Sequence, residues 1–159
     1  MISCVPPIPT HGCSITHNNS ALARILSIDY GRKRTGLAVT DPLQIIASGL
    51  ATVSTLELFD WLKAYVEKES VERIVIGEPR QLDGTPSENL ARVQQFVNRW
   101  RKNMPTIPME FYDERFTSVL AHQAMLDGGL RKKARQNKAL VDEISATILL
   151  EDYMRSRHL

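Results

Sequence analysis

The sequence has few of the residues that build metal centres from sulfur and nitrogen. It holds two cysteines, Cys4 and Cys13, both near its start, and its four histidines are scattered. A disulfide framework or a zinc site needs more such residues at closer spacing. The composition therefore excludes a disulfide-stapled or zinc-stabilised domain and favours a reducing cytosolic setting.

Long apolar runs and a strong net charge are missing too. No apolar segment reaches the roughly 20 residues that a membrane span requires, so we expect a cytoplasmic protein without a membrane partner. The net charge of +2 is too small to indicate nucleic-acid binding by itself. Any such argument has to come from where the charges lie.

The length of 159 residues, with 43% hydrophobic and 24% charged residues, suits one globular domain. Residues 1–22 lack periodicity and are rich in Pro, Ser, Asn and His, without the basic and apolar regions of a signal peptide. We expect residues 1–22 to be a disordered extension or to follow a misassigned start codon, and residues 23–159 to form the domain.

Strands and helices alternate along the rest of the chain. Three apolar segments near the start predict an antiparallel meander: Arg24–Tyr30, Leu37–Thr40 after a hairpin at Gly31–Gly36, and Ile45–Val53. The later segments predict a helix over Thr55–Glu69, a strand over Val71–Gly77, a helix from Thr85 to about Lys102, a strand at Met109–Asp113, a helix capped by Thr117 or Ser118, and a last helix over Lys138–Arg155.

Two of these helices carry more detailed predictions. The spacing in the first helix puts one set of apolar residues on its buried face: Leu56, Phe59, Leu62 and Val66. In the second, Thr85 and Glu88 have the spacing of a capping box. Strands joined through helices run parallel, so the predicted fold is a three-layer α/β domain with a mixed five-stranded sheet, strands 1–3 antiparallel, and helices on both faces.

Three carboxylates stand at positions suited to chemistry. Asp29 ends the first strand, and Glu114, next to Asp113, follows the fifth. Asp142 shares a helix face with small and apolar residues (Ser145, Ala146 and Leu149), so this face should approach the sheet closely. Burying a carboxylate there is costly unless it is paired or binds a metal.

Each carboxylate also has a structural explanation. Asp29 could cap its turn, Glu114 could pair with Arg115, and Asp142 could favour its helix dipole. Ligands of open α/β sheets nevertheless gather at the carboxyl ends of strands, where the three would converge. Oxygen ligands alone suit Mg²⁺ or Mn²⁺, and two such ions roughly 4 Å apart suit phosphoryl chemistry.

Basic residues cluster beside these carboxylates. Such runs are usually solvated, but next to an acidic metal site they can hold a phosphate backbone. The candidates are Arg32, Lys33, Arg34, Arg131, Lys132, Lys133, Arg135 and Lys138.

Four motifs, in this order and spacing, resemble the YqgF family of the ribonuclease H-like superfamily: "IDYGRKRTGLAVTD", "VIGEPRQLDG", "YDERFTS" and "KALVDEISATILLEDY". The resemblance covers residues 24–155 and implies a divalent-metal-dependent nuclease with Asp29, Glu114 and Asp142 as catalytic and metal-binding residues. It also implies a cytoplasmic role in processing the 5′ end of pre-16S rRNA. One departure is Glu78, where the family usually has Leu.

Other functions stay open from the sequence. The family is described as both a Holliday-junction resolvase and a pre-16S rRNA nuclease, so branched DNA is the alternative substrate, and the protein could be a monomer or a homodimer. A non-catalytic RNA-binding module of ribosome assembly would need the same basic patches. An ATPase of the actin and sugar-kinase type would need a second domain, for which the chain is too short.

Overall fold

The computed structural model describes residues 22–79, 85–113 and 137–157. Its elements are β1 (Arg24–Tyr30), β2 (Arg34–Thr40), β3 (Ala47–Ser54), α1 (Leu58–Lys68), β4 (Val71–Glu78), α2 (Leu90–Asn103), β5 (Met109–Asp113) and α5 (Lys138–Arg157). Four expectations lie outside the described residues: the extension over 1–21, the helix capped by Thr117 or Ser118, the position of Glu114, and the basic residues at 131–135.

The strands form one mixed sheet in the order β3-β2-β1-β4-β5. β1 pairs antiparallel with β2, and β2 pairs antiparallel with β3. β4 lies between β1 and β5 and runs parallel to both. The predicted mixed sheet, with strands 1–3 antiparallel, is therefore confirmed. Because β1, β4 and β5 are parallel, their carboxyl ends lie at the same end of the sheet.

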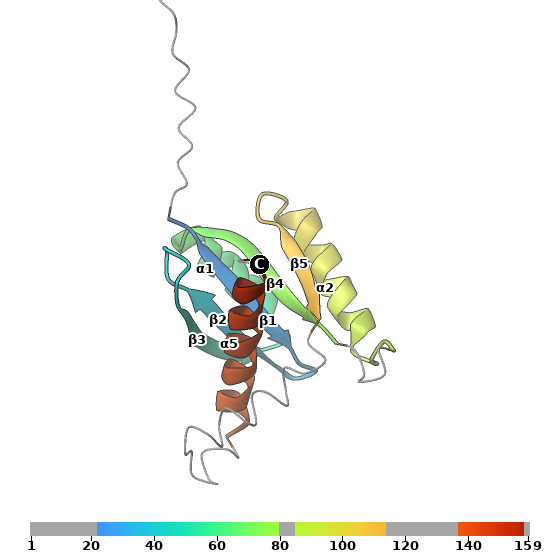
Figure 1. Ribbon diagram of the computed structural model, residues 1–159. Coiled ribbons are helices and arrows are strands. Elements are labelled where there is room, and N and C mark those ends of the chain that lie inside the picture. The colour runs from blue at the N-terminus through green and yellow to red at the C-terminus, as the bar shows by residue number, and fades with distance from the viewer. Residues whose placement is uncertain (1–21, 80–84, 114–136, 158–159) are drawn as a thin grey trace, which may run out of the picture.

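Helices cover both faces of this sheet, with α5 on one face and α1 and α2 on the other (Figure 1). The α1/α2 face holds a core that includes the aromatic side chains of Phe59, Phe96 and Trp100. The α5 face holds a smaller core of Ile25, Ala38, Val75, Ala146, Leu149, Leu150 and Tyr153. The predicted three-layer arrangement is thus confirmed.

The alternation of side chains along β1 shows towards which face of the sheet Asp29 points. Leu26 and Ile28 pack in the core under α1 and α2, whereas Ile25 packs under α5. Ser27 also faces α5, because its Oγ donates a hydrogen bond to the Ala146 carbonyl at 2.6 Å. Successive side chains point to opposite faces, so Asp29 continues the Ile25 and Ser27 series towards α5.

The prediction that Leu56 lies on the buried face of the first helix is wrong. α1 begins at Leu58, and Leu56 is 93% exposed, while Phe59 and Leu62 are buried as predicted. The reason is that Thr55 is tied to the first hairpin: its amide donates to Lys33 O at 3.0 Å and its hydroxyl to Gly31 O at 2.8 Å. Residues 55–57 therefore form a turn.

The predicted capping box at Thr85 and Glu88 is also wrong. α2 begins at Leu90 with Asn89 as its N-cap residue. The preceding segment is instead held by the strand ends, since the Ser87 amide donates to Pro79 O at 3.1 Å and Asn89 Nδ2 donates to Tyr30 O at 2.8 Å. Contacts with β1 and β4 thus delay the start of the helix.

Candidate active site

Gly36 brings Asp29 and the helix of Asp142 together. It lies opposite Asp29 in the β1–β2 pairing, inside β2, whereas the sequence suggested a turn position for it. A Cβ atom at Gly36 would overlap the backbone carbonyl of Asp142. Only glycine therefore lets the first turns of α5 lie against the sheet at this point. Sequence reasoning missed this role, because a glycine after "GRKR" is normally a turn residue.

Asp142 lies in the part of α5 that packs against β2 at Gly36. Ser145, Ala146 and Leu149 are buried, as the helical spacing predicts. The Asp142 side chain keeps 25% of its surface exposed, and its Oδ2 accepts a hydrogen bond from Arg34 Nε at 3.1 Å. Arg34, predicted to bind phosphate, is thus paired with a candidate metal ligand in this structure.

The environment of Asp29 disfavours its negative charge. Burial, and to a smaller extent the nearby charge of Asp142, together raise the pKa of Asp29 to about 7. Within the described part of the chain, no cation or hydrogen-bond donor contacts the Asp29 carboxylate. A bound divalent cation would supply the missing counter-charge. The carboxylate oxygens of Asp29 and Asp142 are the kind of ligand that suits Mg²⁺ or Mn²⁺.

Two further carboxylates at this end of the sheet point the other way. Asp113 is paired in register with Glu78. In β5, Met109 packs in the α1/α2 core and Tyr112 lies against the core under α5. Alternation therefore directs Asp113, and with it Glu78, towards the α1/α2 face, away from Asp29. Among the described residues, no group of three or more His, Cys, Asp or Glu is placed to hold a metal, and Glu114 is not among them.

The candidate phosphate-binding residues that the structure describes lie at the same end. Arg32 and Lys33 are exposed in the turn between β1 and β2, and Arg32 comes within 4.0 Å of Glu88. Lys138 is exposed at the start of α5, one turn before Asp142 and therefore on the same side of the helix. These three cations are therefore available to bind a phosphate at the same end of the sheet as Asp29 and Asp142.

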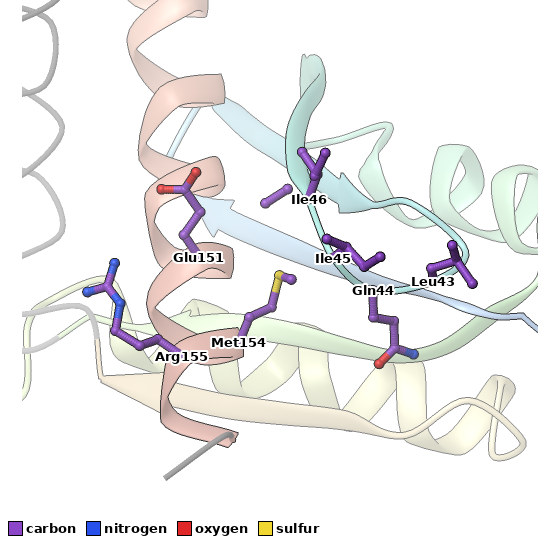
Figure 2. Close-up of a pocket in the computed structure, with 8 residues that line it drawn as sticks. Leu43, Gln44, Ile45, Ile46, Glu151, Met154 and Arg155 are labelled. Atoms are coloured by element: carbon purple, nitrogen blue, oxygen red, sulfur yellow. The ribbon is translucent and has the colours of Figure 1, made fainter.

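A cavity of about 690 Å³ lies far from these carboxylates, between the loop 41–46 and the last turns of α5 (Figure 2). Leu43, Ile45 and Ile46 each expose more than 60% of their surface there. The Asp41 carboxylate holds this loop by accepting the amides of residues 43, 45 and 46 at 2.7–3.0 Å. This cavity is at the amino end of β1 and is not part of the acidic site.

No helix in the described ranges has the length and apolar character to cross a membrane.

Comparison with known proteins gives consistent results. The family described as "RuvX: Holliday junction resolvase" matches residues 23–156. A "Putative pre-16S rRNA nuclease" of Phocaeicola vulgatus is 65% identical over 136 residues, covering 86% of this chain and 98% of that protein. A protein of the same name from Bacteroides fragilis is 58% identical over 138 residues, covering 87% of this chain and all of that protein. The structure of T. thermophilus RuvC in complex with a Holliday junction substrate superposes with a TM-score of 0.53 at 18% identity, covering 84% of this chain and 96% of that one. The shared fold confirms the ribonuclease H-like architecture.

Proposed function

The chain belongs to the RuvX family, and from this membership and its acidic site we propose that it is a metal-dependent nuclease that hydrolyses phosphodiester bonds. The observation that carries the proposal is the meeting of Asp29 and Asp142 at the carboxyl end of β1. Two carboxylates in one half-buried place cost stability. Gly36, which lets α5 approach, and the Ser27–Ala146 hydrogen bond hold them there.

We propose that Asp29, Asp142 and Glu114 hold Mg²⁺ or Mn²⁺ in a two-metal site. Such ions supply an activated water and stabilise the departing 3′-oxygen. Glu114 is preferred over Asp113 because strand alternation directs Asp113 to the opposite face of the sheet. Glu78 is directed to that opposite face as well, so the departure from the family's usual Leu does not add a ligand.

Other residues of the chain position the acidic site and bind the substrate. Asp29 lies on β1, which is paired on both sides, so its carboxylate is positioned without rearrangement. Arg32, Lys33 and Lys138 bind phosphates that flank the scissile one. The sequence adds Arg131, Lys132, Lys133 and Arg135 to this set. Arg34, which donates a hydrogen bond to Asp142, offers its charge to the same phosphates when a cation takes over that carboxylate.

The substrate we propose is the 5′ end of pre-16S rRNA in the cytoplasm. The relatives with 65% and 58% identity are named putative pre-16S rRNA nuclease, whereas the RuvC of the solved junction complex is only 18% identical. Branched DNA is the second candidate, because the matching family is described as a Holliday junction resolvase. A cleavage panel with Mg²⁺ or Mn²⁺ that compares precursor rRNA, single-stranded RNA and four-way DNA junctions separates the two.

The substitution Asp29→Asn tests the mechanism. It should lower turnover by on the order of 10³-fold while binding of nucleic acid is kept or improved, because one negative charge is removed. Asp60→Asn is the matched control, since Asp60 lies exposed in the first turn of α1, away from the acidic site. Unchanged cleavage by Asp29→Asn would refute the nuclease mechanism, and a wild type that binds RNA without metal-dependent cleavage would instead favour a non-catalytic RNA-binding module.

A further inference from the structure

A second cavity, of about 290 Å³, opens on the other face of the same sheet end. It lies between the turn that precedes α1 and the outer side of α2. Its lining includes Tyr30, Leu56, Phe59, Arg92, Gln95 and Arg99, a set that we call the α2 groove. Tyr30 follows Asp29 directly on β1, and neighbouring residues of a strand point to opposite faces. The α2 groove therefore adjoins the acidic site across the tip of β1.

The α2 groove is lined by a helix with cations and no acids. Residues 90–103 include four Arg or Lys and neither Asp nor Glu. Arg92, Gln95 and Arg99 follow one another at helical spacing along the groove, and all three are exposed. Burial raises the pKa of the Tyr30 phenol, and Arg92 is close enough to oppose part of this rise. The charge of this surface is complementary to a polyanion.

The same groove offers flat and apolar contacts. The Cζ atom of Arg99 lies over the Phe59 ring, 4.0 Å from its centre, so a cation–π contact positions this guanidinium at the groove. Tyr30 packs on Phe96 with the ring centres 5.4 Å apart. Leu56 is 93% exposed at the edge of the groove. Stacked guanidinium planes and aromatic faces are the surfaces on which unpaired bases rest in single-strand binding proteins.

We propose that the α2 groove binds a single-stranded segment of the nucleic acid next to the scissile phosphate. This inference rests on the nuclease function proposed above and extends it to the path of the substrate. A nucleic-acid strand that crosses the carboxyl end of β1 passes from Asp29 on one face of the sheet to Tyr30 on the other. Arg32, in the exposed turn, lies beside this path. Arg92 and Arg99 hold its phosphates, and Leu56 and the Arg99 plane contact a base. Glu88, which comes within 4.0 Å of Arg32, is an exposed acid close to this path.

The experiment measures binding apart from cleavage. Each variant is made in the Asp29→Asn background, and its affinity for single-stranded RNA and for DNA of the same sequence is measured by fluorescence anisotropy at several salt concentrations. Arg92→Gln with Arg99→Gln should weaken binding about tenfold and flatten the log–log salt dependence by about one unit per lost phosphate contact. The loss should be large for strands of about 12 nucleotides and small for strands of about 4 nucleotides, which do not span both sites.

Two matched controls lie at the other end of the molecule. Lys68→Gln with Arg155→Gln removes the same charge from exposed positions near the amino end of β1. Leu56→Asp, which adds a negative charge to the α2 groove at an exposed position, should also weaken binding. Leu43→Asp is its control, because Leu43 is 61% exposed in the distant cavity. Melting curves verify that all variants fold.

The outcomes are distinct. Loss of affinity in the groove variants, with normal binding in both controls, supports the proposal for whichever nucleic acid binds. Groove variants that bind like their controls overturn it, and they leave the nuclease function intact if the wild type still cleaves. A parent protein that neither binds nor cleaves any nucleic acid overturns the inference and the proposed function together.

Discussion

The two faces of the sheet differ in what they bury. The α1/α2 face packs large apolar side chains, among them Trp100, Phe96 and Phe59. The α5 face carries Ser27, Gly36 and Asp29 along the line where the helix crosses β1 and β2. Burial of apolar surface contributes most of the stability of a domain, whereas polar groups in a close helix–sheet contact reduce it. The difference indicates that one face stabilises the fold and the other positions the chemistry.

The largest effect should come from the aromatic core. Trp100 is fully buried, and its indole N–H donates to Ile107 O at 3.1 Å. Trp100→Ala should lower the free energy of unfolding by about 3–5 kcal/mol, because a large cavity forms and a carbonyl loses its partner. Urea unfolding measures the loss. The turnover of the folded protein at saturating substrate should be unchanged, and a fall in this turnover would contradict the division between the faces. Trp100→Phe is the milder control.

Gly36→Ala, on the α5 face, should reduce both stability and activity. The added methyl group would overlap the Asp142 carbonyl, so α5 must move away from β2. We expect a loss of about 1–3 kcal/mol in stability together with a loss of turnover, because Asp142 moves from Asp29. Gly49→Ala is the matched control: its methyl group would meet the end of the Glu143 side chain at 3.3 Å, which can move aside. Equal behaviour of the two alanine variants would show that close approach at Gly36 is not required.

The acidic site should make the metal-free protein less stable as the pH rises. Between the unfolded pKa of 3.8 and the folded pKa of about 7, the folded state binds more protons at Asp29 than the unfolded state does. The free energy of unfolding therefore falls with rising pH through this window and levels off above it. In a chelator at about pH 8, Asp29→Asn should be more stable than the wild type by on the order of 4 kcal/mol, and near pH 4 the two should be alike. Chemical denaturation of both proteins at several pH values in this window measures the difference. If the two free energies of unfolding changed in parallel with pH, the burial of this charge would be contradicted.

The smallest effect on stability should come from the Arg34–Asp142 pair. Both side chains are partly exposed, so Arg34→Ala should change the free energy of unfolding by less than about 1 kcal/mol. Because Arg34 competes with a divalent cation for Asp142, the variant should need less Mn²⁺ for half-maximal binding, as measured by calorimetry. Lys33→Ala, which alters the neighbouring exposed cation, should leave metal binding unchanged and weaken nucleic-acid binding. An unchanged Mn²⁺ affinity in Arg34→Ala would show that Arg34 acts on phosphate alone.

Much of the fold could be predicted from local patterns. The strands Arg24–Tyr30 and Met109–Asp113 have the predicted bounds, and the last helix begins at Lys138 as predicted. The errors at Leu56 and at the Thr85 capping box have one cause. Both segments lie beside strand ends and form hydrogen bonds with residues outside the segment, Gly31 and Lys33 in one case and Pro79 and Tyr30 in the other. Local spacing contains no information about such partners.

The sequence by itself determined the chemistry that is available: acidic residues at strand ends and on a helix face, cations beside them, and a family whose motifs they match. The tertiary structure decided which of these residues meet. The pairing of β1 with β2 sets Gly36 opposite Asp29, and the absent side chain lets α5 bring Asp142 there. Strand alternation directs Asp113 and Glu78 to the other face, although they carry carboxyl groups as Asp29 does. The physical reason is that side-chain type is a local property, whereas close approach depends on register and on the volume of residues far away in the chain.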